Sequence, residues 1–62
     1  MDPTLNLTIQ VQLAKTILKE YDDEMNPLGE KFNEKCALLA EMMLDLNDWI
    51  NNGGTLPRQW ER

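Results

Sequence analysis

Histidine is absent from this 62-residue chain, and Cys36 is its single cysteine. One thiol cannot form an internal disulfide, and without histidine it cannot complete the ligand set of a zinc site. No histidine is present to activate the thiol as a nucleophile, so we expect Cys36 to be a buried structural residue. We therefore expect no catalytic residue, no metal, no cofactor and no enzymatic activity.

Basic residues and long apolar runs are also scarce. Six lysines and arginines stand against eleven aspartates and glutamates, which gives a formal net charge of −5. Affinity for nucleic acid comes from clustered lysine and arginine, so we expect no direct binding to nucleic acid. The apolar runs are far shorter than the roughly 20 residues of a membrane span, and the Met1–Pro3 start lacks the character of a secretion signal. These absences predict a cytoplasmic protein that does not associate with membranes.

The small size of the chain limits its stability as a monomer. A domain of about 60 residues buries only about 60% of the surface that its unfolded chain exposes. Disulfides and structural metals, which stabilise many domains of this size, are excluded here. We therefore expect a homo-oligomer or a protein partner to supply the missing stabilisation.

Hydrophobic spacing predicts an all-α fold in a single domain, 1–62. We expect an N-terminal arm (1–7), a short first helix (8–25) capped by Asn6 or Thr8, a long second helix (27–52) and a tail (53–62). A strand over residues 5–13 is the alternative for the first segment. Its apolar residues alternate with polar ones, as in a half-buried strand: Leu5, Leu7, Ile9, Val11 and Leu13.

Two breaks in the pattern predict how the helices are connected. Asn26 and Pro27 suit the start of the second helix, and Gly53 with Gly54 suits its end. The short connection between the helices predicts an antiparallel hairpin. Because the second helix is expected to be longer, its end needs cover, and we expect the tail to fold back with Trp60 as a lid.

The second helix carries an apolar seam with the spacing of a coiled coil. Its members are separated by 4, 3, 4, 3 and 4 positions. Such a seam packs against another helix, within the chain or in a second copy, so we expect a dimeric four-helix arrangement. The core or dimer seam consists of Phe32, Cys36, Leu39, Met43, Leu46 and Ile50.

A second apolar stripe on the same helix is the candidate binding surface. Tryptophan and methionine are favoured at protein interfaces, and this stripe is not covered by the predicted first helix. A wider core is the alternative reading of the same residues. The candidate partner-binding residues are Leu38, Met42, Trp49 and Trp60.

Acidic residues gather within an arc of roughly 60° on this helix. Most such rows are the solvated side of an amphipathic helix. The alternative is a surface that mimics the phosphate backbone and blocks a nucleic-acid-binding protein. This acidic face consists of Glu30, Glu34, Glu41, Asp45 and Asp48.

The segment from Leu44 to Trp60 resembles the C-terminal end of short, functionally uncharacterised helical proteins encoded by bacteriophages and prophages. The resemblance covers about the last quarter of the chain and implies a host bacterial cytoplasm as the setting. It implies no activity by itself. The matching positions are Leu46, Trp49, Ile50, Gly53, Gly54, Leu56, Pro57 and Trp60.

Together these patterns predict a small acidic protein–protein interaction module. By analogy with small acidic phage proteins, we expect a modulator or inhibitor of a host protein, with defence complexes among the targets. A nucleic-acid mimic that acts through the acidic face is the alternative, and a structural or assembly subunit is the third class.

Overall fold

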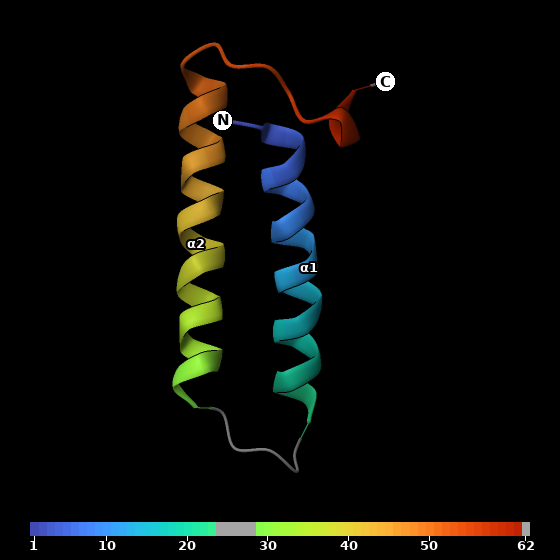
Figure 1. Ribbon diagram of the computed structural model, residues 1–62, viewed down its shortest axis with the longest axis vertical. Coiled ribbons are helices and arrows are strands. Elements are labelled where there is room, and N and C mark those ends of the chain that lie inside the picture. Colours follow the sequence, from blue (N-terminus) through green and yellow to red (C-terminus); the bar gives the residue numbers. More distant parts are fainter. Residues whose placement is uncertain (24–28, 62) are drawn as a thin grey trace.

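The computed structural model describes residues 1–23 and 29–61, and these form two long helices and a short one (Figure 1). Helices α1 (Pro3–Asp22) and α2 (Glu30–Asn51) lie side by side and antiparallel, and a 3-10 helix, η1 (Arg58–Trp60), lies in the tail. The described residues contain no strand, so the predicted all-α helical hairpin is confirmed. None of their helices has both the length and the apolar character needed to span a bilayer.

Helix α1 begins at Pro3, and the predicted arm over 1–7 was therefore wrong. Asp2 is the N-cap, and its carboxylate accepts a hydrogen bond of 3.0 Å from the backbone N–H of Leu5. Proline suits the first helical position because its ring already holds φ near the helical value and its missing N–H is not needed there. Residues 5–13 are consequently helical rather than extended, and the apolar alternation there leaves Leu5 and Ile9 exposed.

The other ends of the helices also differ from the predicted boundaries. Helix α1 ends at Asp22 with Asp23 as its C-cap, before the predicted end at residue 25. Gly29, the N-cap of α2, is extended with φ −121° and ψ −165°, so α2 begins after it and not at Pro27. The predicted cap Asn26 and Pro27 itself lie outside the described residues. With 20 and 22 residues, the helices are nearly equal, and the predicted overhang of a long second helix was wrong.

The C-terminal end of α2 confirms the predicted glycine stop. Gly53 has φ 87°, in the left-handed region that glycine adopts without a steric penalty. Its N–H donates to the carbonyl of Ile50 at 3.1 Å, and the N–H of Gly54 donates to the carbonyl of Trp49 at 2.8 Å. These two bonds form a Schellman motif, which satisfies the last carbonyls of α2 and reverses the chain.

The tail then folds back across the N-terminal end of α1 (Figure 1). The N–H of Arg58 donates to the Thr4 hydroxyl at 2.9 Å, and the Gln59 amide donates to the Thr8 hydroxyl at 2.9 Å. Pro57, between the turn and η1, is fully buried. The predicted fold-back is thus present, and the tail is held both by polar groups of α1 and by the end of α2, where the Trp49 indole N–H donates to the carbonyl of Thr55.

The contact between the two helices is a narrow strip. Leu46 is the best-buried large aliphatic side chain of the described residues, at 4% exposed. Gln10 of α1 is also buried, and its amide donates to the Asn6 side chain. Near the other end of the helices, Lys35 forms an ion pair with Glu20. The molecule measures 43 × 22 × 13 Å, so it is a single layer of helices without a second layer to complete a core.

Leu46→Ala tests whether this strip holds the hairpin together. Truncating a buried leucine costs about 2–5 kcal/mol, so we expect the melting temperature to fall by at least about 10 °C. Leu44→Ala is the matched control, because Leu44 is 58% exposed on the same helix, and we expect its effect to stay within about 0.5 kcal/mol. Circular dichroism during thermal unfolding measures both. Equal effects of the two substitutions would contradict this description of the core.

Candidate protein-interaction surface

The predicted seam of α2 faces α1 except at one position. Leu46 is buried, Phe32, Cys36, Leu39 and Ile50 are half-buried, and Met43 is 56% exposed. Met42, which is not part of the seam, is half-buried instead of Met43. Around the helix axis, Met42 lies about 40° from buried Leu46, whereas Met43 lies about 60° from it on the other side. Met43, predicted to belong to the core or dimer seam, is therefore turned away from the contact within the chain, and Cys36 is a free thiol that is only partly covered.

The predicted partner-binding residues differ in exposure and in position. Met42 and Trp49 are half-buried, and the Trp49 indole N–H donates to the backbone carbonyl of Thr55 at 2.9 Å. Gly54 lies so close to this indole that a Cβ added there would come within 2.4 Å of ring atoms. The Trp49 indole therefore packs against the turn at Gly54 and is hydrogen-bonded to the segment that follows it. Leu38 stays 45% exposed on α2, and Trp60 lies apart from it, against α1.

A different apolar surface, which we call the apolar face, emerges from two rows of residues. Each row has the 4, 3, 4, 3 spacing that keeps residues on one side of a helix. Neither row contains a charged residue, and Trp60 of the tail extends the face at one end. The row on α1 is Leu7, Val11, Ala14, Leu18 and Tyr21, and the row on α2 is Cys36, Ala40, Met43, Asn47 and Ile50.

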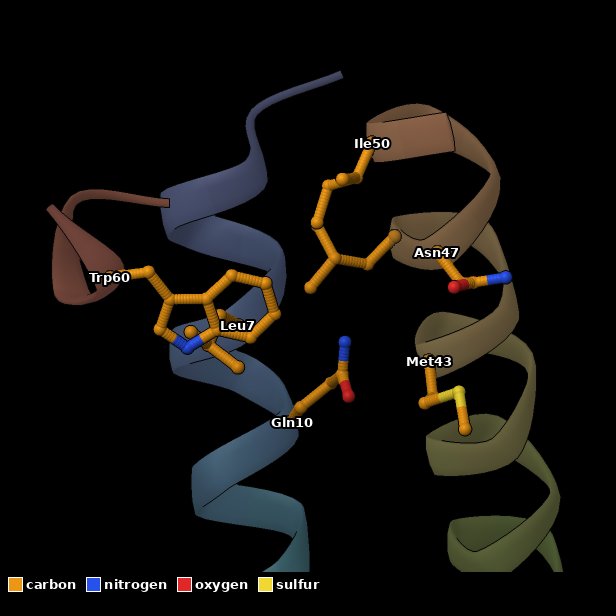
Figure 2. Close-up of a pocket in the computed structure, with 7 residues that line it drawn as sticks. Leu7, Gln10, Met43, Asn47, Ile50 and Trp60 are labelled. Carbon is orange, nitrogen blue, oxygen red and sulfur yellow. The ribbon is translucent and has the colours of Figure 1, made fainter. Parts of the chain in front are cut away.

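A pocket shows that the two rows lie on the same side of the hairpin. Its volume is about 330 Å³, and buried Leu46 contributes to its lining. Figure 2 shows Trp60 beside Leu7 on the α1 side of this pocket, with Met43 and Ile50 coming from α2 on the opposite side. The pocket is thus an apolar depression at the end of the face formed by the N-terminal half of α1, the C-terminal half of α2 and the tail.

The large side chains of the face are unusually exposed for a protein of this size. Tyr21 is 64% exposed, Leu18 62%, Met43 56% and Trp60 49%. They lie on a surface whose two rows contain no charged residue, and about half or more of each side chain is exposed to solvent. Such a surface can bind apolar side chains of another polypeptide, and contiguous exposed patches of this kind mark interaction sites.

No family model, curated protein or solved structure matches this chain. The apolar face therefore indicates function through its own geometry and chemistry.

The acidic face is a separate surface. All five of its residues are exposed, and its centre lies roughly 140° around α2 from the row of Cys36 to Ile50. None of the five forms an ion pair within the described part of the chain, where Lys35 is paired with Glu20 of α1 instead. Charge and apolar area are thus segregated onto different sides of the hairpin.

The row on α1 is the part of the surface that sequence reasoning missed. Its heptad spacing is visible in the sequence, from Leu7 through Val11 and Ala14 to Leu18 and Tyr21. Assigning residues 1–7 to an arm removed Leu7 from the helix and hid the regularity of the row. The Asp2-Pro3 start signal would have revealed it.

The two tryptophans differ in ways that fluorescence can measure. In Trp49→Phe, the remaining Trp60 is half exposed, so we expect acrylamide to quench it readily. In Trp60→Phe, the remaining Trp49 is covered by the turn and hydrogen-bonded, so we expect weaker quenching and a blue-shifted emission maximum. The reverse order of quenching would show that the tail does not fold back as described.

Proposed function

We propose that this protein is a protein–protein interaction module that binds other polypeptides through its apolar face. The observation that carries the proposal is the pair of uncharged rows on one side of a single-layer hairpin, with the pocket at one end. Binding of this kind uses burial of apolar area and needs no cofactor, metal or catalytic residue.

The accessible surface of the chain supports this proposal. The chain exposes 5111 Å², whereas a compact monomer of its 7.2 kDa mass exposes about 4,100 Å². The excess of roughly 1,000 Å² is close to the roughly 800 Å² that each partner buries in a standard interface. The excess accessible surface of the chain is thus comparable to the surface that one partner buries in a standard protein–protein interface.

We also propose the biological role that the sequence suggests. Two hairpins pair into a dimeric four-helix arrangement, and the module modulates or inhibits a host protein, with defence complexes among the targets. The setting in a host bacterial cytoplasm rests on the resemblance of Leu44–Trp60 to proteins of bacteriophages and prophages. A structural or assembly subunit would use the same apolar face.

A nucleic-acid mimic is the second candidate, and the acidic face favours it. Five exposed carboxylates without ion pairs in the described residues follow one side of α2. A protein that binds DNA or RNA through lysine and arginine would be attracted to such a row. The two candidates use different sides of the hairpin, so substitutions can separate them.

Affinity purification from a bacterial host tests the choice between the two surfaces. We expect the charge-reversed variant Glu34→Lys/Glu41→Lys/Asp45→Lys to retain a specifically bound host protein with affinity within about threefold of the original. We expect Leu18→Glu to lose that protein, because an unpaired charge in an apolar contact costs several kcal/mol.

Leu5→Glu is the matched control for Leu18→Glu. Leu5 is 55% exposed on the same helix but lies about 140° around α1 from Leu18, so this variant should keep the host protein. Loss of binding in the charge-reversed variant, together with a steep fall in affinity as salt is raised, would instead establish the acidic mimic.

A further inference from the structure

Building on the proposed function, we infer that the apolar face is occupied by a second, antiparallel copy of this chain. In this dimer, α1 packs on the partner's α1 and α2 on the partner's α2. The twofold axis passes through the centre of the face, beside Ala14 on α1 and Met43 on α2. The copies thereby form the four-helix arrangement from two complete hairpins.

The regular spacing of the face indicates that its occupant is helical. Rows spaced 4, 3, 4, 3 present side chains that interdigitate with a helix lying nearly parallel or antiparallel to them. Two such rows side by side require two helices, and a second hairpin supplies them. This pairing also gives the single layer its missing second layer, with the excess surface matching one partner's share of an interface.

The apolar face has a pocket at one end and projecting side chains at the other, so two copies in opposite orientations fit each other in shape. The pocket lies at the end near Leu7, Ile50 and Trp60. On the same row of α1, toward its C-terminal end, stand the two most exposed large apolar side chains of the described chain, Leu18 and Tyr21. Inverting one copy places these projecting side chains over the partner's pocket, and the symmetry repeats the contact at the other end.

The position of the axis follows from the two rows. Leu7 and Tyr21 are equally distant from Ala14 along α1, and Cys36 and Ile50 are equally distant from Met43 along α2.

These two midpoints lie within one helical turn of the same level of the hairpin. Glu20 is level with Lys35, and Gln10 is level with Leu46, so Ala14 is level with the turn of α2 that contains Met43. Small Ala14 at the axis lets the two copies of α1 approach closely.

The charges of the chain are compatible with self-association. Each copy carries a net charge of −5, which opposes pairing, but both rows are uncharged and the acidic face lies roughly 140° away around α2. Like charges therefore stay on the outside of the dimer, where solvent and salt screen them.

Sedimentation equilibrium tests the occupancy of the face. We expect twice the 7.2 kDa chain mass at micromolar concentration for the original protein and for Leu5→Glu. We expect Leu18→Glu to weaken dimerisation by more than about 100-fold, because it places two glutamates in the interface. A monomeric original protein at hundreds of micromolar, or equal loss in the two variants, would overturn the inference.

Disulfide cross-linking tests the orientation without relying on a destabilised variant. In Cys36→Ser/Ala14→Cys, the two new thiols face each other across the axis, so we expect oxidation to convert most of the protein into a covalent dimer. In Cys36→Ser/Leu18→Cys, the thiols are about 12 Å apart along α1, beyond disulfide reach, so we expect little cross-linking. Efficient cross-linking at position 18 but not at position 14 would overturn the antiparallel arrangement.

The same samples distinguish failure of this inference from failure of the proposed function. A monomer that captures a host protein, and loses it in Leu18→Glu but not in Leu5→Glu, would overturn the inferred dimer while the apolar face kept its binding role. A dimer with the expected cross-linking pattern supports the inference whether or not a host protein is captured.

Discussion

A layer of two helices can bury only the strip of each helix that faces the other, and the rest of this structure depends on that constraint. Leu46 is well buried, whereas most other apolar side chains at the contact are only half covered. Apolar residues next to the strip therefore remain in water, and the resulting surface excess is comparable to one side of a standard protein interface. The small core and the exposed apolar area have the same physical origin in this chain.

The tail extends the surface that the helices expose. The Schellman motif at Gly53 and Gly54 reverses the chain, and Trp49 holds the reversed segment through the carbonyl of Thr55. Hydrogen bonds to Thr4 and Thr8 then hold η1 against α1, which places Trp60 at the rim of the pocket. The tail thus builds one end of the apolar face, so the two tryptophans have distinct positions, one in the turn and one on the face.

The separation of charge from apolar area bears on how the module can act. The acidic face keeps the chain repelled from other anionic molecules and remains available whatever occupies the apolar face. If a second copy covers the rows, the dimer presents two acidic faces to the outside. If a different protein covers the rows, the acidic face instead sets the rate and salt dependence of encounter.

The sequence by itself determined the helical class, the glycine stop and the hairpin, because periodicity and capping chemistry are local. The start of α1 also depends on local chemistry, the cap Asp2 and the first helical residue Pro3. The alternation of apolar and polar residues over 5–13 suggested a later start, so this signal was missed. Only the tertiary structure decided which side of α1 meets α2. Two rows of α1 have heptad spacing, and hydrophobicity favours the one from Leu7 to Tyr21. The structure turns inward the other row, which includes Gln10 and Glu20, because Asn6 satisfies Gln10 and Lys35 pairs with Glu20 across the helices. The Asn6–Gln10 pair is local to α1, but the Lys35–Glu20 pair depends on a neighbouring helix that no local pattern contains, and this orientation leaves the more apolar row on the surface.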